Sequence, residues 1–169
     1  MSAIAMVERL IAFDTTSALS NLALIDDVRA YLKGFGIESR LTFNDEKTKA
    51  NLYATIGPQG AGGVVLSGHT DVVPVAGQNW TSDPFKVRRA NGRLYGRGTS
   101  DMKSFIAVAL HLVPELAKKK LKTPIHFAFS FDEEVGCHGA RTLIKDIVEN
   151  LPRPRVVIVG EPTMMKLIN

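Results

Sequence analysis

Three short apolar runs, each followed within two residues by a histidine or an acidic residue, constrain the fold of this chain more than any other feature. The runs cover residues 64–67, 125–131 and 156–159, and the segments between them include stretches with the apolar spacing of amphipathic helices. Strands that alternate with helices predict an α/β fold with a mostly parallel sheet covered on both faces. In such open sheets ligands bind outside the carboxyl ends of the strands, so we expect a functional site at that edge.

The remaining elements follow from apolar periodicity and turn residues. Asn91-Gly92 between two short apolar segments predicts a β-hairpin over residues 85–96. Pro114 is expected to kink or end the third helix near that position. We expect helices over residues 3–13, 20–33, 102–116 and 139–148, and strands over 37–43, 51–56, 63–67, 125–131 and 155–159, with a further strand beginning at 166–169.

Composition excludes several classes of protein. With 169 residues the chain is long enough for one α/β domain or for part of a larger one, and its net charge is +4. Lys118–Lys120 and Lys122 fall at an expected helix end without interleaved aromatic residues, which favours a solvated helix end over a nucleic-acid surface. A single cysteine fits a reducing compartment. The sequence shows no signal peptide and no apolar stretch of about 18 residues. We therefore expect a cytoplasmic protein without nucleic-acid or membrane partners.

The strand ends collect residues that bind metals or transfer protons. His69 and Asp71 follow the first run, Asp132-Glu133-Glu134 ends the second, Glu161 follows the third, and Asp101 leaves the hairpin just before a helix. Each has an ordinary structural alternative: a structural histidine, a solvated acidic turn, or a helix N-cap. Because one edge of the sheet can gather all of them, their coincidence favours a metal site.

One imidazole with several carboxylates is compatible with zinc, cobalt or manganese. A carboxylate shared by two ions fits hydrolysis at a two-metal site, where ions about 3.5–4 Å apart clamp a bridging water. The neighbouring side chains of Glu133 and Glu134 diverge, so one can bind metal while the other acts as general base.

Several segments resemble the acetylornithine deacetylase and succinyl-diaminopimelate desuccinylase family of dinuclear zinc amidohydrolases. The resemblance runs from the first helix to the last residue. It is carried by residues 67–74, 77–80, 92–103, 132–137 and 160–163, in the order that the family has them. It implies a three-layer, zinc-exopeptidase-like catalytic domain with a mixed, mostly parallel sheet. Residues 77–80, 132–137 and 160–163 are most similar to acetylornithine deacetylases.

The resemblance also implies roles for individual residues. His69 and Glu161 would hold one metal ion, Glu134 the other, and Asp101 would bridge the two. Glu133 would be the general base, and Asp71 the acid that orients His69. The implied reaction is hydrolysis of N2-acetyl-L-ornithine to L-ornithine and acetate in arginine biosynthesis, with two zinc ions per full site that cobalt can replace. The resemblance further implies a cis peptide bond between Asp101 and Met102.

Family members are about twice as long, with an inserted dimerisation (lid) domain and a final histidine ligand. Residues 1–169 are therefore expected to be an N-terminal part of the catalytic domain, inactive alone and binding one metal ion or none. The full-length protein is expected to form a homodimer and act on a small N-acyl amino acid. A succinyl-diaminopimelate desuccinylase, another aminoacylase or carboxypeptidase, and a non-catalytic metal-binding domain are the alternatives. Cys137 is expected to be a small buried residue and not a nucleophile.

Overall fold

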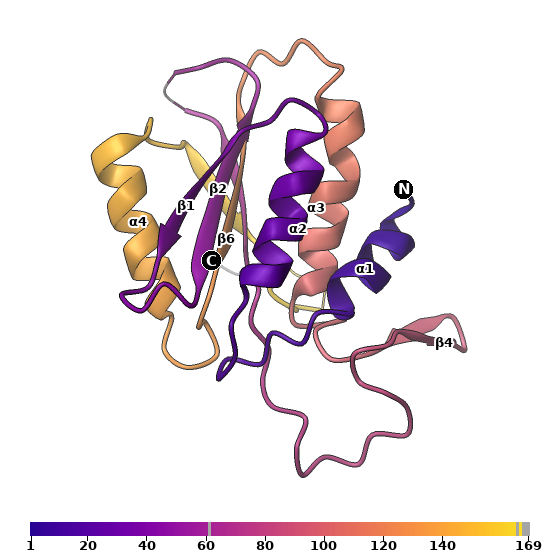
Figure 1. The fold of residues 1–169 in the computed structure, drawn as a ribbon. Helices are drawn as coiled ribbons and strands as arrows, with labels where there is room; N and C mark the ends of the chain where they lie inside the picture. Colours follow the sequence, from indigo (N-terminus) through magenta and orange to yellow (C-terminus); the bar gives the residue numbers. More distant parts are fainter. Residues whose placement is uncertain (61, 165, 167–169) are drawn as a thin grey trace.

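A five-stranded mixed sheet forms the centre of the molecule (Figure 1), in the order β1-β2-β6-β3-β7. The structure is a computed structural model that describes residues 1–60, 62–164 and 166. Every strand expected from the sequence within these residues is present. The strands are β1 (Ser39–Phe43), β2 (Ala50–Ile56), β3 (Val64–His69), β6 (Ile125–Ser130) and β7 (Val156–Val159). The strand expected to begin at residues 166–169 lies outside the described residues, apart from Lys166.

The predicted α/β class is confirmed, and the sheet divides into two halves. Strands β6, β3 and β7 are parallel neighbours, whereas β2 pairs antiparallel with both β6 and β1. The three parallel strands therefore end at one edge, as the sequence predicted. Val64 lies opposite Ile125 and Val156, and His69 lies opposite Ser130, so the register brings the ends of β3 and β6 level with each other.

Helices lie on both faces of the sheet, as Figure 1 shows. On one face, α2 (Leu22–Lys33) and α3 (Lys103–Leu116) pack against the strands, and α1 (Ala3–Ile11) packs on α3. On the other face, α4 (His138–Asn150) covers β1, β2 and β6. The main core lies between the sheet and the first three helices, where Leu10, Leu24, Ile106, Leu110 and Phe127 are fully buried. None of the helices in the described part of the chain has both the length and the hydrophobicity of a membrane span.

Helix α3 continues past Pro114 to Leu116 instead of ending at the proline. Proline lacks the N–H that would bond the carbonyl four residues earlier, which is that of Leu110. The hydroxyl of Tyr31 donates to this carbonyl at 3.3 Å, so the freed acceptor has a partner. A tyrosine on α2 thus allows α3 to add its last turn.

The outer half of the α4 face is open, contrary to the expectation of a sheet covered on both faces. All four residues of β7 are exposed, although they are valines and an isoleucine. A groove of about 900 Å³ lies beside them, between α4 and the parallel strands. Its apolar lining includes Val65, Leu143, Ile147, Val157 and Val159. The groove extends to His69 and Glu161 at the carboxyl end of the sheet.

This open edge should make the chain self-associate in solution. An exposed apolar edge strand presents unpaired backbone groups and pairs readily with another chain. Val157→Lys places a charge in the middle of β7 and should shift the equilibrium toward monomer. Val108→Lys, at a comparably exposed valine of α3, is the matched control. Sedimentation velocity as a function of concentration measures both, and a wild-type chain that stays monomeric at its solubility limit would contradict the prediction.

The predicted hairpin is present as β4 (Arg88–Ala90) and β5 (Arg93–Tyr95). Asn91 and Gly92 form its turn with positive φ angles of 51° and 71°, the combination that a type I′ turn requires. From β5 the chain runs through residues 96–102 into α3, which brings Asp101 to the end of the sheet.

Candidate metal centre

His69 is the last residue of β3 and lies at the centre of the candidate site. Its side chain is almost fully buried, and its backbone N–H points at the sulfur of Met102, 3.3 Å away. The next residue, Thr70, donates from its N–H to the carbonyl of Ser130 at 2.8 Å, which continues the alignment with β6. Gly68 allows α3 to approach the strand, because a Cβ there would lie 3.1 Å from a side-chain carbon of Ile106 on α3.

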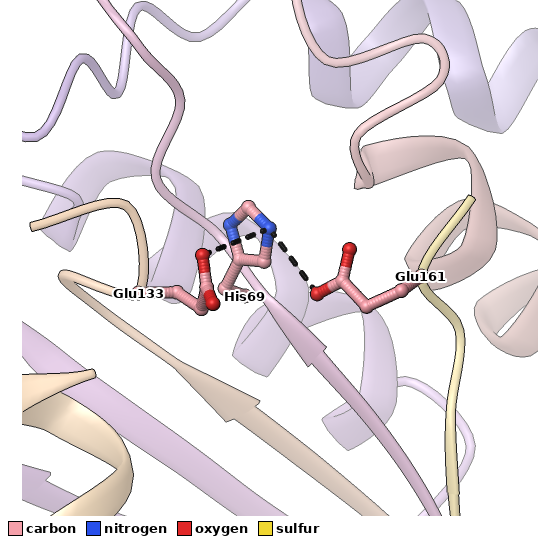
Figure 2. A group of neighbouring side chains, drawn as sticks. All are labelled: His69, Glu133 and Glu161. Carbon is pink, nitrogen blue, oxygen red and sulfur yellow. Dashed lines mark ion pairs between the residues drawn. The ribbon is translucent and has the colours of Figure 1, made fainter. Parts of the chain in front are cut away.

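The two nitrogens of the His69 ring face different partners. Nδ1 lies 2.9 Å from the backbone carbonyl of Asp71 and 3.5 Å from its carboxylate. Nε2 faces three acids: it lies 2.9 Å from Asp101, 3.7 Å from Glu161 and 3.9 Å from Glu133. Figure 2 shows Glu133 and Glu161 approaching the ring from opposite sides. The contact on Nδ1 orients the ring so that Nε2 points into the acidic cluster.

Asp71 is buried and makes more contacts than its expected role of orienting His69 requires. One carboxylate oxygen accepts from the N–H of Glu133 at 3.0 Å. The other accepts from the hydroxyl of Ser17 at 2.7 Å and from the N–H of Glu134 at 3.3 Å. The carboxylate therefore also supports the loop that carries the two glutamates.

Asp101 precedes a cis peptide bond to Met102, as the family resemblance implied. Met102 is fully buried, whereas the side chain of Asp101 is 47% exposed and reaches His69 from the loop before α3. Lys103 begins α3 and is also fully buried. Its ammonium donates to the carbonyl of Phe13 at 2.7 Å, just past the end of α1.

Glu161 follows β7 and is held near the ring by close packing at the preceding residue. A Cβ on Gly160 would lie only 2.0 Å from the ring of Phe105 on α3, so only glycine fits there. The N–H of Gly160 donates to the carbonyl of Ser67 at 3.2 Å, which extends the pairing of β7 with β3. These contacts place Glu161 opposite His69.

Residues 132–137 form a turn between β6 and α4 that directs Glu133 and Glu134 toward the site. Asp132 and Cys137 both adopt left-handed backbone conformations, with φ angles of 53° and 57°. The expectation that Cys137 is buried is wrong: it is exposed, because the turn places it just before α4 at the rim of the groove. Its sulfur lies 3.6 Å from a carboxylate oxygen of Glu133, and partial desolvation together with this negative charge raises the pKa of the thiol.

The crowding of acids around one buried imidazole shifts several pKa values. Burial acts to lower the pKa of His69, but the hydrogen bond and charge of Asp71, assisted by Asp101, outweigh it and raise the pKa to about 9. Burial and the charge of Asp101 raise the pKa of Glu134. Burial raises the pKa of Glu161 as well, with added repulsion from Asp101 and Glu133. A cation within this cluster would offset the repulsion among the carboxylates.

The donor atoms are of the types that bind divalent metals, but neither group of three unites His69 with both Asp101 and Glu161. Two groups have one ligand atom from each residue within 4.8 Å of the others: His69, Glu133 and Glu161, and His69, Asp101 and Glu134. Ligands about 2.0–2.2 Å from a common tetrahedral ion are separated by roughly 3.3–3.6 Å. The separation of His69 and Glu161 is close to this range. The first group places Glu133, expected to be the general base, among possible ligands.

Sequence reasoning identified the acids and the histidine but missed the polar residues that support them. Ser17, Asn21, Lys49 and Lys103 were treated as ordinary loop or helix residues. Asn21 lies at the start of the helix expected over residues 20–33, a position with no functional signal of its own. In the structure the Asn21 amide donates to Ala50 and to Thr70, both at 2.9 Å. Such partners are distant in sequence, so no local pattern identifies them.

Residues 65–168 match peptidase family M20/M25/M40. The chain is 38% identical over 170 residues to an acetylornithine deacetylase of Pasteurella multocida, covering 96% of this chain and 44% of the relative. It is 40% identical over 149 residues to an acetylornithine deacetylase of Shigella sonnei, covering 87% of this chain and 38% of the relative. The chain thus spans about two fifths of the length of these curated relatives.

Solved structures share the fold at lower sequence identity. An M20 family metallo-carboxypeptidase from Sulfolobus solfataricus superimposes with a TM-score of 0.81 at 21% identity, covering 95% of this chain and 37% of that protein. Human carnosine dipeptidase 1 gives a TM-score of 0.75 at 20% identity, with 88% and 35% covered.

Proposed function

The chain belongs to peptidase family M20/M25/M40, and we propose that it forms the N-terminal part of the catalytic domain of a metal-dependent deacetylase. The proposed substrate is N2-acetyl-L-ornithine, which is hydrolysed to L-ornithine and acetate. The identity of 38–40% to acetylornithine deacetylases supports this substrate over other N-acyl amino acids. The single observation that carries the chemistry is the ring of His69, whose Nε2 faces three carboxylates within 4 Å.

In the proposed site, His69 and Glu161 would hold one divalent ion, Glu134 would hold a second, and Asp101 would contribute to both. Zinc, replaceable by cobalt, would polarise the acetyl carbonyl and lower the pKa of a bound water. The carboxylate of Glu133 would take a proton from the attacking water and pass it to the leaving amine. Asp71 orients His69 through its backbone carbonyl and supports Glu133 through the amide N–H of that residue.

Succinyl-diaminopimelate is the rival substrate within the proposed enzyme class. Hydrolysis of both substrates should be measured with the 169-residue chain alone. If the coding sequence continues beyond Asn169, the same assay should be run with the longer protein that it encodes. We expect the longer protein with zinc or cobalt to prefer acetylornithine and the 169-residue chain to stay near background. Preference for succinyl-diaminopimelate would overturn the substrate, and comparable turnover by both proteins would overturn the assignment of this chain as part of a site.

A non-catalytic metal-binding domain is the second candidate. It is favoured by the presence of one imidazole in the acidic cluster among the described residues. Metal binding by both proteins without hydrolysis by either would support it.

Metal binding should be coupled to proton release. Because the pKa of His69 is raised to about 9, its ring is protonated at neutral pH and must lose a proton to bind an ion. The apparent affinity for Co²⁺ should therefore rise about tenfold per pH unit from about pH 7 and level off near pH 9. Visible absorption titrations at several pH values measure it. His138→Asn, which changes an exposed histidine beside the same turn, should leave the slope unaltered. An affinity independent of pH would contradict the prediction.

The proposed acetylornithine deacetylase activity also implies a cellular setting and an oligomeric state. We place the reaction in arginine biosynthesis in the cytoplasm, and we assign homodimerisation to a domain outside residues 1–169. Sedimentation of the longer protein and its distribution between cell fractions test these points.

A further inference from the structure

Two residues outside the acidic cluster, Ser17 and Lys49, contact the segments that carry it. We propose that both are positioning residues of the site: through Asp71 and Asp132 they fix the turn that carries Glu133 and Glu134. The inference rests on the proposed function for its catalytic meaning, because it concerns the same site. Its structural content can be tested without metal or substrate.

Ser17 is buried, and its position is set by backbone pairing. Its N–H donates to the carbonyl of Val72 at 3.0 Å, and the N–H of Val72 donates to the carbonyl of Thr15 at 3.1 Å. Residues 15–17 thus run beside residues 71–73 as a short parallel pair. This pairing aims the Ser17 hydroxyl at Asp71, to which it donates at 2.7 Å.

Asp71 connects Ser17 to the turn at residues 132–137. Its carboxylate accepts from the N–H groups of Glu133 and Glu134, at 3.0 and 3.3 Å. Hydrogen bonds to an ionised acceptor are roughly twice as strong as neutral ones. The Ser17 hydroxyl fixes the rotation of the carboxylate, and the carboxylate fixes both amides.

Lys49 ties the same turn to the same segment from the other side. Its ammonium donates to the backbone carbonyl of Ser17 and forms an ion pair with Asp132, both at 2.5 Å. The side chains of this pair are 14% and 15% exposed, so solvent screens their attraction only in part. Asp132 directly precedes Glu133, so the ion pair holds the residue at which the turn begins.

Loss of either side chain should loosen the turn without removing any candidate ligand. Polar groups that orient metal ligands typically change metal affinity or activity by about 10–100-fold when they are mutated. We therefore expect Ser17→Ala and Lys49→Met to weaken Co²⁺ binding within this range. Ser17→Thr, which keeps the hydroxyl, should bind more tightly than Ser17→Ala.

The decisive readout is amide hydrogen exchange of the metal-free chain, followed by NMR. In Ser17→Ala and Lys49→Met, the amides of Glu133 and Glu134 should exchange at least about tenfold faster relative to Leu110, which lies in the middle of α3. The ratio to Leu110 separates loosening of the turn from a general loss of stability. Ser20→Ala and Lys47→Met are the matched controls. Ser20 bonds the Thr48 carbonyl instead of Asp71, and Lys47 is exposed two residues before Lys49.

An exchange ratio unchanged in both variants would overturn the inference, whatever their stability. A change in the controls as large as in the variants would also overturn it. The Co²⁺ spectrum of the wild-type chain tests the proposed function separately. Absence of Co²⁺ absorption from both this chain and a longer protein that contains the whole site would count against the metal site, while the exchange ratio would still decide whether Ser17 and Lys49 position the turn.

Discussion

Replacing Asp71 with alanine should lower the free energy of unfolding of the metal-free chain by about 3–5 kcal/mol, the range found when one partner of a buried charged pair is removed. The variant leaves the hydroxyl of Ser17 and the amides of Glu133 and Glu134 without their acceptor. It also removes the carboxylate on the Nδ1 side of the buried His69 ring, whose Nε2 keeps Asp101 at 2.9 Å. Urea denaturation at neutral pH measures the change.

The same variant should lower the pKa of His69. Asp71 makes the largest contribution to raising it against the effect of burial, so the pKa should fall from about 9 to near or below its ordinary value. An NMR titration of the ring measures this in variants that remain folded, for which Asp71→Asn is the milder alternative. Asp45→Ala, at an exposed carboxylate, should change stability by less than about 0.5 kcal/mol. A loss below about 1 kcal/mol for Asp71→Ala would show that the pair contributes little to stability.

Glu133→Gln should lower kcat by about 10²–10⁴-fold in a protein that contains the whole site, because the amide cannot accept the proton of the attacking water. The metal content should stay unchanged if Glu133 acts only as general base. The metal content distinguishes a general base from a ligand, because a carboxylate oxygen of Glu133 lies within 4.8 Å of ligand atoms of both His69 and Glu161. A simultaneous loss of metal would identify Glu133 as a ligand. Glu149→Gln, at an exposed residue of α4, should alter neither quantity.

Periodicity and turn residues predicted most elements of the fold because those signals are local. The span of α3 and the Asn91-Gly92 hairpin depend on neighbours a few residues away, and both were found within a few residues of their expected limits. The antiparallel place of β2 beside β6 was not predicted, because strand order depends on contacts between residues more than 60 positions apart. The open face beside β7 was missed for the same reason, since an apolar run does not reveal what covers it.

In the candidate site, too, the residues with a local sequence signal were predicted and those that depend on distant contacts were not. Acids at strand ends were identifiable because the ends of parallel strands meet at one edge, and His69, Asp101 and Glu161 do lie together. The supporting residues were missed because Ser17 and Lys49 are common in solvated loops. Only the fold shows that their partners are Asp71 and Asp132. The family resemblance, and not the pattern of residues, identified the cis bond after Asp101.

The buried ammonium of Lys103 joins the N-terminal helix to the site in a way that matters for anyone who modifies that end of the protein. Burial lowers its pKa to about 8, although the carboxylates of Asp14 and Asp71 oppose the shift. The Phe13 carbonyl is its hydrogen-bond partner, and Asp101 lies two residues before it in the chain. A deletion that removes the first helix together with Phe13 would remove both carbonyls, of Leu10 and Phe13, that accept from this ammonium. A tag or fusion that displaces the helix would also displace Lys103, and with it the loop that carries Asp101. Reagents built on this protein should therefore be attached away from the N-terminal helix.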